Sequence, residues 1–197
     1  MKLTRESLPY SLITGAILPR LGGRRYSVRT MNLYLMRHGI AAAKEDASVK
    51  HDGERPLTDK GIKRMRKAAK GVSRLGIAFD CVLTSPLLRA RQTAEIVCRT
   101  LGIEDRLEEI SALAPESTVE HLLFGLTRYQ DREHLLLVGH EPLLSSFTVY
   151  LLGGQKSVNL KLDFKKGCLC RIESELSAGN PATLHWLLTP KQLRSLD

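Results

Sequence analysis

The stretch Leu33–Gly39, which reads Leu-Tyr-Leu-Met-Arg-His-Gly, decides the architecture of this chain. Its first four positions are apolar or aromatic, and no proline or glycine interrupts them, which predicts a short buried β-strand. At the end of the strand a cation and an imidazole, Arg37 and His38, stand directly before Gly39. Because glycine turns the backbone with either sign of φ, both side chains can face a common point. Ligands of open α/β sheets bind beyond the carboxyl ends of the strands, so we expect the chemistry to be built at His38.

Apolar runs of strand length alternate with segments of helical period along the rest of the chain. Thr58 is expected to cap the first helix, and Ser85 with Pro86 to open the second. No internal repeat is visible, and Trp186 is expected in the core. The order of elements predicts a three-layer α/β/α sandwich with a mostly parallel central sheet. The expected helices are 58–75, 86–101, 119–126 and 143–152, the further strands are 80–84, 134–138, 160–173 and 183–188, and segments 40–54 and 108–115 are expected to be irregular.

Composition and charge are those of an ordinary globular protein with a basic first segment and a mildly basic remainder. The chain has 197 residues, of which 43% are hydrophobic and 26% charged, enough for one domain with a real core. The net charge is +9, but residues 1–30 hold six basic residues and one acidic residue. Aromatic residues make up only 5% of the chain, so the charge is weak support for a nucleic-acid partner, and we expect none. The mildly cationic remainder suits an anionic substrate.

We divide the chain into residues 1–30 and a domain of residues 31–197. The first segment is basic, and its apolar run 8–18 is too short to span a bilayer. Since Met31 stands where the first strand begins, we expect residues 1–30 to be a disordered extension or a mis-assigned start, with an organelle transit peptide left open. The four cysteines lack zinc spacing, so we expect reduced thiols, a cytoplasmic location and no membrane partner.

Two arginines and two histidines fall beyond the expected strands. Arg37 and His38 end the first strand, Arg89 lies near the start of the helix after the second, and His140 follows Gly139. Guanidinium and imidazole groups without an acidic cluster suit a phosphoryl group and not a metal, so we expect neither metal nor cofactor. The same part of the second helix also carries Arg91, which is as easily a surface ion-pair partner. The remaining histidines are expected to be structural or exposed: His51, His121, His134 and His185.

Taken in order, these motifs resemble the histidine phosphatase superfamily, which has an Arg-His-Gly signature and includes the phosphoglycerate mutases. Within it the chain is similar to the small SixA-type phosphohistidine phosphatases. The resemblance runs from about Met31 to Leu193 and implies a phosphoglycerate-mutase-like fold. It is carried by the segments 35–39 (LMRHG), 55–58 (RPLT), 85–94 (SPLLRARQTA), 138–143 (VGHEPL) and 186–190 (WLLTP).

The resemblance also implies a role for each matched residue. His38 would attack phosphorus through Nε2 and carry the phosphoryl group, while a backbone carbonyl near the turn holds the Nδ1 proton. Arg37 and Arg89 would clamp the phosphate oxygens, and His140, protonated or donating, would supply further positive density. Arg55 would add to the phosphate pocket. These cations would do the work that a metal ion does elsewhere.

The chain departs from many superfamily members where they carry a general acid, after the second motif. Glu108 and Glu109 are candidates there by proximity alone. A phosphorylated histidine leaves as neutral imidazole and needs less help than an alkoxide. We therefore expect the partner to be a phosphohistidine-bearing signalling protein, such as a histidine phosphotransfer domain. Two alternatives stay open: a small-molecule phosphomonoesterase or mutase, and a non-catalytic phosphate- or protein-binding module that docks through the basic helix 58–75.

Overall fold

A six-stranded sheet with the order β3-β2-β4-β1-β5-β6 forms the centre of the molecule. The computed structural model describes residues 30–43, 45, 50–153, 159–176 and 182–197, so the prediction for residues 1–30 lies outside the described residues except at Thr30. Strands β1 to β4 pair in parallel, whereas β5 is antiparallel to both of its neighbours. The expected mostly parallel sheet is therefore confirmed. The strands are β1 (Met31–Arg37), β2 (Cys81–Thr84), β3 (Leu107–Glu109), β4 (His134–Gly139), β5 (Leu169–Ser174) and β6 (Thr183–Leu188).

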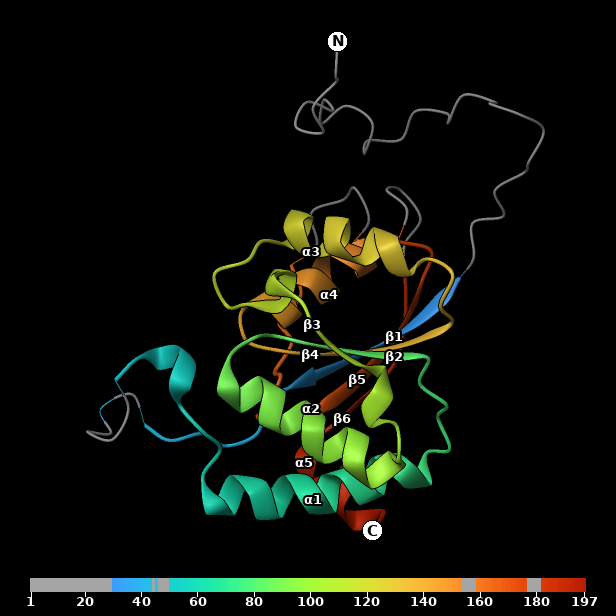
Figure 1. Cartoon of the computed structure of the whole chain (residues 1–197). Helices are drawn as coiled ribbons and strands as arrows, with labels where there is room; N and C mark the ends of the chain where they lie inside the picture. Colours follow the sequence, from blue (N-terminus) through green and yellow to red (C-terminus); the bar gives the residue numbers. More distant parts are fainter. Residues whose placement is uncertain (1–29, 44, 46–49, 154–158, 177–181) are drawn as a thin grey trace, which may run out of the picture.

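Helices cover both faces of the sheet and complete the expected three layers (Figure 1). One face carries α1 (Asp59–Arg74), α2 (Leu88–Leu101) and α5 (Pro190–Ser195). The other face carries α3 (Val119–Leu126) and α4 (Leu143–Gly153). None of the described helices is long and apolar enough to cross a membrane.

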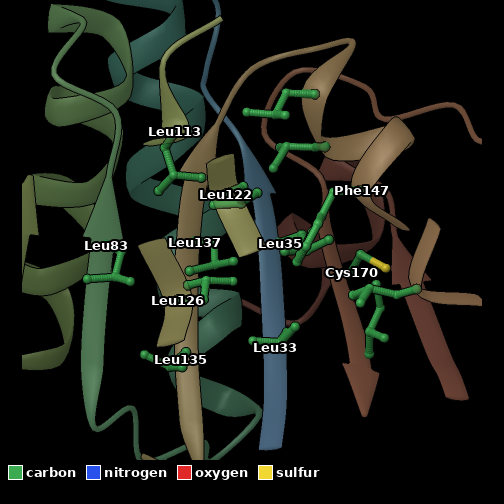
Figure 2. Close-up of a cluster of buried hydrophobic side chains, with 14 of the residues drawn as sticks. Leu33, Leu35, Leu83, Leu113, Leu122, Leu126, Leu135, Leu137, Phe147 and Cys170 are labelled. Atoms are coloured by element: carbon green, nitrogen blue, oxygen red, sulfur yellow. The ribbon is translucent and has the colours of Figure 1, made fainter. Parts of the chain in front are cut away.

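Each face of the sheet has its own hydrophobic core, because successive side chains of a strand point to opposite faces. Thus Leu33 and Leu35 of β1 join one cluster, and Tyr34 and Met36 join the other. Figure 2 shows the first cluster, where leucines of neighbouring strands meet side chains of α3 and α4. Burying each such side chain contributes about 1.5–3 kcal/mol. The continuous apolar runs of β1 and β4 are therefore explained by helices on both faces.

Helix α1 holds the turn that follows β1. Its N-cap is Thr58, as expected, whose hydroxyl accepts a hydrogen bond from the backbone N–H of Gly61 (3.0 Å). The backbone N–H of Thr58 in turn donates to the carbonyl of Ile40 (2.9 Å). A Cβ on Gly61 would collide with that carbonyl oxygen, and one on Gly71 would collide with the carbonyl of Leu193 in α5. Two glycines thus let α1 approach both the site turn and the C-terminal helix closely.

The start of the second helix differs from the prediction. Helix α2 begins at Leu88, and its N-cap is Leu87, which makes no side-chain capping bond. Ser85 and Pro86 are therefore not the N-cap and first helical residue. The Ser85 hydroxyl still accepts from the backbone N–H of Leu87 (3.3 Å), but it also contacts His140, as described below. The expected end of the helix at Gly102 is confirmed, with that residue in the left-handed conformation.

Three further local expectations were wrong. Residues 108 and 109, expected to be irregular, belong to the edge strand β3. Of the expected strand 160–173, only the part from Leu169 pairs in the sheet. The preceding residues form a turn in which Gly167 has a φ of 83° and donates its N–H to the carbonyl of Arg37 (2.9 Å). Trp186 is half-buried against the second cluster and not in its centre.

Candidate active site

The two histidines of the matched motifs lie side by side because β1 and β4 are parallel neighbours. Arg37 pairs with Gly139 in the register of these strands, so the next residue of each chain segment is a histidine. The backbone N–H of His38 donates to the carbonyl of Gly139 (3.1 Å). The ring centroids of His38 and His140 are 5.0 Å apart, and the side chains are buried. The carboxyl ends of the central strands therefore present a pair of imidazoles.

His38 is held as a neutral imidazole with a defined tautomer. Its Nδ1 lies 2.7 Å from the carbonyl oxygen of Gly39, which can only accept, so Nδ1 carries the proton. Nε2 is then left with its lone pair free. Burial, followed by the nearby His140, lowers the pKa of His38 to about 3. A neutral ring with a free Nε2 is the form in which an imidazole acts as a nucleophile.

Helix α2 places Arg89 against the same turn. The backbone N–H of Gly39 donates to Thr93 Oγ1 (3.0 Å), and that hydroxyl donates to the carbonyl of Arg89 (2.7 Å). The Arg89 side chain is only 6% exposed. Threonine at this position therefore links the turn after β1 to the backbone of the helix that carries the arginine.

His140 has one ring nitrogen engaged and one without a partner. Its Nε2 lies 2.8 Å from Ser85 Oγ. That oxygen accepts from the backbone N–H of Leu87 and can donate its own proton to Nε2, and in this tautomer Nδ1 carries the proton of the ring. Burial, followed by the charge of Arg89, lowers the pKa of His140 to about 3. Of the two expected forms, protonated or donating, the lowered pKa favours the neutral ring, which donates from Nδ1 when Ser85 donates to Nε2.

Three unpartnered polar atoms mark the centre of the site. Within the part of the chain that the structure describes, the buried side-chain nitrogens or oxygens without a hydrogen bond are Arg37 Nε, Arg89 Nε and His140 Nδ1. Leaving such a group buried and unpaired costs about 1–3 kcal/mol, and more for a charged group. The charges of both arginines act on both histidines. The arrangement is therefore that of a site for a ligand with several acceptor atoms.

A carboxylate from the loop before α1 completes the site, and the sequence did not single it out. Asp52, in the short 3-10 turn η2 (Asp52–Glu54), lies between two arginines. Its Oδ2 accepts from Arg89 (3.0 Å) and its Oδ1 from Arg55 (2.7 Å), while its carbonyl also accepts from Arg89 (2.7 Å). Partial burial would raise the pKa of Asp52, but the hydrogen bonds and charges of Arg55 and Arg89 outweigh it and hold that pKa below its usual value. The one available signal was an aspartate three residues before Arg55.

Arg55 is connected to the site by its ion pair with the carboxylate of Asp52. Its Nε donates to the carbonyl of Ala42 (2.8 Å), and the residue is buried apart from 9% of its surface. Arg37 is fixed by a hydrogen bond from its guanidinium to the carbonyl of Phe164 (2.6 Å). All five expected site residues thus lie in one region, with Arg37 and Arg89 beside the paired imidazoles of His38 and His140 and Arg55 at the rim.

The two glutamates considered as general acids lie elsewhere. Glu108 accepts a hydrogen bond from the hydroxyl of Tyr129 (2.7 Å), and Glu109 pairs with the exposed Arg91 (3.1 Å). Neither contacts a residue of the site, and Arg91 is committed to the surface. Three other histidines also find partners outside the site: His121 with Ser117, His134 with Tyr34 and His185 with Glu173.

The chemistry of these groups fits an oxyanion. Arginines supply forked donors that match phosphate oxygens, and the paired neutral imidazoles supply a nucleophile and a further donor. Among the described residues, no three histidine, cysteine or acidic side chains are placed to hold a metal ion.

Comparisons with known proteins identify the same family from two directions. Residues 33–122 match the model of the histidine phosphatase superfamily (branch 1). The chain is 30% identical over 167 residues to the phosphohistidine phosphatase SixA of Escherichia coli K12, which covers 83% of this chain and 97% of that protein. An uncharacterized protein of Picosynechococcus sp. is 38% identical over 169 residues, with 83% of this chain and 99% of that protein covered.

A solved structure agrees with the sequence comparison. The structure of the protein histidine phosphatase SixA complexed with tungstate superposes with a TM-score of 0.71 at 27% identity, and the match covers 83% of this chain and 99% of that one. Fold, motif order and sequence identity thus point to one family. The chain belongs to the histidine phosphatase superfamily, as a phosphatase of the SixA type.

Proposed function

We propose that this protein removes phosphate from a phosphorylated histidine of a signalling protein, through a covalent intermediate on His38. The observation that carries the proposal is the group of unpartnered donors on Arg37, Arg89 and His140 beside a neutral His38. A phosphoryl group offers several oxygens that can accept from such donors. The SixA relative is named a phosphohistidine phosphatase, and the superposed structure holds tungstate, another oxyanion.

In the first step, Nε2 of His38 attacks phosphorus while the bond from phosphorus to the substrate histidine breaks. The Nδ1–H of His38 keeps its hydrogen bond to the carbonyl of Gly39, and this hydrogen bond stabilises the positive charge that the ring gains. Arg37 and Arg89 stabilise the equatorial oxygens, and His140 donates a hydrogen bond to one of them. The product of this step is a phosphoryl group on His38 and a released imidazole.

The leaving group decides between substrate classes. A phosphohistidine protonated on its other ring nitrogen departs as neutral imidazole, whereas an alkyl phosphate departs as an alkoxide that requires a proton. The carboxylate in contact with the site arginines is Asp52, and in the free protein its lowered pKa leaves it ionised, with no proton to give. Glu108 and Glu109 are occupied elsewhere. The described site therefore favours the substrate that needs the least help.

In the second step, water attacks the phosphoryl group of His38. The new bond from oxygen to phosphorus forms as the bond to Nε2 breaks, and inorganic phosphate carries away the proton of the water. The same arginines stabilise both displacements, because the phosphoryl group passes through a similar transition state each time. We expect activity to persist in EDTA, since the two arginines that meet the phosphate are cationic and would repel a metal ion.

The substrate is tested by parallel turnover assays. Histidine phosphotransfer domains phosphorylated on histidine, free phosphohistidine, and a panel of sugar and nucleotide phosphates are each given to the wild-type protein. We expect kcat/KM to be highest for the phosphorylated domains. Faster turnover of a sugar or nucleotide phosphate would replace the proposal with a small-molecule phosphomonoesterase, and no turnover of any substrate would favour a binding module.

The covalent intermediate is tested by trapping. Brief reaction with ³²P-labelled substrate followed by denaturation should leave label on His38, released by acid and stable to alkali, as a phosphoramidate is. His38→Ala should abolish both turnover and labelling while the protein remains folded. The control is His121→Ala, an exposed histidine outside the site, which should keep both. Label on another residue in the His38→Ala protein would contradict the assignment.

We also propose a reducing, cytoplasmic location. The described cysteines Cys81, Cys98, Cys168 and Cys170 are buried free thiols, and burial, the main cause for each, raises the pKa of these thiols to about 12. Buried thiols of this kind are structural and unreactive, which fits a compartment in which disulfides do not persist.

A further inference from the structure

A groove of about 560 Å³ opens next to the phosphate site, between α1, α5 and the segment 163–166. Arg37 and Gly39 form part of its wall, so the groove is continuous with the turn that carries His38. In Figure 1, α5 lies beside α1 on the same face of the sheet. The groove therefore leads from the outer surface of the molecule to the end of β1.

The lining of this groove is strongly cationic. It contains one acidic residue, Asp163, and six basic ones: Arg37, Arg64, Lys165, Lys166, Lys191 and Arg194. Among the described residues, the only ion pair made by these six joins Lys165 to Asp163 at 3.7 Å. The whole chain from 31 to 197 has 24 basic and 20 acidic residues, a net charge of +4. The groove lining, with six basic residues and one acidic residue, has a net charge of +5, so the rest of this region carries a net charge of −1.

The positive field of the groove merges with that of the phosphate site. Lys166 has its pKa lowered by burial and, beyond that, by the charges of the site arginines Arg37, Arg55 and Arg89. Uncompensated like charges in one place lower the stability of the folded state, and they become favourable only when an anion neutralises them. The charge of the groove is therefore that of a surface suited to binding an acidic partner.

The rest of the lining indicates what kind of anion fits. Met65, Ala68 and Pro190 contribute apolar surface, and none of the described residues that line the groove is aromatic. Single-stranded nucleic acids bind largely by stacking bases on aromatic rings, which this groove does not offer. A second copy of this chain, whose net charge is +9, would bring further positive charge. An acidic, partly apolar face of a protein matches both the charge and the apolar lining.

We propose that this groove binds carboxylates on the surface of the phosphoprotein substrate, so that its phosphohistidine enters the site beyond Arg37. This inference rests on the function proposed above and adds the chemistry by which the substrate protein is selected. The catalytic residues would recognise the phosphoryl group alone, whereas Arg64, Lys191 and Arg194 would distinguish an acidic phosphoprotein from a neutral one.

The test uses peptides of about twelve residues with a central histidine, long enough to extend past the phosphate site. One peptide carries flanking glutamates and its match carries glutamines. Binding of the fluorescein-labelled, unphosphorylated peptides is measured, and kcat/KM is measured for the phosphorylated forms and for free phosphohistidine. At low ionic strength we expect the glutamate peptide to bind about tenfold more tightly than the glutamine peptide, with a preference that shrinks as salt is added.

Two matched double variants locate the effect. Lys191→Glu with Arg194→Glu reverses two charges on α5 at the groove and should remove the preference in both binding and kcat/KM. Arg74→Glu with Arg99→Glu reverses two charges near the ends of α1 and α2, outside the groove lining, and should keep it. Both should hydrolyse free phosphohistidine like the wild type, which shows that the catalytic residues are intact.

Equal preference in the two double variants would overturn the groove as the docking surface. Binding of an oligothymidylate of the same charge as tightly as the glutamate peptide, lost in the α5 variant, would assign the groove to nucleic acid instead. The binding arm needs no turnover, so a groove-dependent preference without hydrolysis of any phosphohistidine substrate would contradict the proposed function and support the docking surface.

Discussion

Arg89 and Arg91 lie two positions apart on α2 and yet occupy opposite environments. The Arg89 side chain is 6% exposed and holds Asp52, whereas Arg91 is 44% exposed and pairs with Glu109 and Glu95. Removing a buried donor that stabilises transition-state charge costs about 10²–10³ in rate. We therefore expect Arg89→Ala to lower kcat by that factor and Arg91→Ala to change it by less than about threefold, as an exposed ion-pair residue does.

The measurement is steady-state turnover of a phosphorylated histidine domain by both variants, with circular dichroism to verify folding. A large loss of activity in Arg91→Ala together with near-normal activity in Arg89→Ala would show that Arg91, and not Arg89, binds the phosphate. The matched pair is informative because both substitutions remove the same side chain from the same helix.

The two site histidines also make stability depend on pH. Burial, the main cause in both, lowers the pKa of His38 and of His140 to about 3, whereas an unfolded histidine has a pKa of about 6.5. Between these values the unfolded chain binds more protons, so the stabilisation from neutral histidines is complete above about pH 6.5 and lost as the pH falls toward 3. We expect His38→Gln with His140→Gln to lose less stability on acidification than the wild type does, by on the order of 1 kcal/mol or more per histidine.

Urea unfolding of both proteins at neutral and mildly acidic pH measures this difference. The exposed His121→Gln serves as the control and should follow the wild type. If wild type and double variant lost the same free energy of unfolding between the two pH values, the histidines would not be neutral in the folded protein.

At the scale of elements, the close approach of α1 to the site turn links packing to activity. A methyl group on Gly61 would collide with the carbonyl of Ile40, the residue that follows Gly39, and one on Gly71 would collide with the carbonyl of Leu193. Overpacking of this kind costs about 1–3 kcal/mol, which exceeds the gain of alanine over glycine in a helix, about 1 kcal/mol. We expect both alanine variants to unfold at lower urea concentration, but only Gly61→Ala to lose kcat as well.

Activity per folded molecule separates the two effects, because Gly71→Ala is a destabilised control that leaves the site turn in place. Equal kcat in the two variants would show that α1 supports the fold without positioning His38.

The predictability of each element follows from its length and its pattern. Strands β1 and β4 are apolar runs that end in Arg-His-Gly and Gly-His, so both the strands and the paired histidines could be placed from the sequence. Strand β3 is three residues long with two glutamates, and such an edge strand shows no hydrophobic period. Helix α5 spans six residues, too few for a period, although its capping box between Thr189 and Gln192 was a local signal.

Asp52 shows why part of the site could not be predicted. It lies in a polar loop without period, and its importance comes from a contact with Arg89, 37 positions away in the chain. A sequence pattern reports neighbours along an element, whereas this carboxylate acts through a fold that brings η2 against α2. The sequence motif was enough to select Arg55, but its partner Asp52 became visible only in the structure.

At the scale of the molecule, β1 is central in position and near the start of the described chain. It pairs with β4 on one side and β5 on the other, and Met31, its first residue, is only 2% exposed. Both hydrophobic clusters and all the site residues lie between Met31 and Leu193. A domain that begins at Met31 therefore contains every contact that shapes the site in the described residues.

We expect a chain that begins at Met31 to fold and to turn over substrate like the full chain, because the described core and site residues lie within it. The two kcat/KM values should agree within about twofold, which is a small difference, since 1 kcal/mol already alters an equilibrium about fivefold. A chain that begins at Leu35 is the contrasting case, because it loses half of the central strand and with it the pairing of Leu33 with Leu135 and Ile172. It should be insoluble or unfolded. Thermal unfolding and turnover of the two shortened chains measure the outcome, and a Met31 chain that folds poorly or lacks activity would move the domain boundary into residues 1–30.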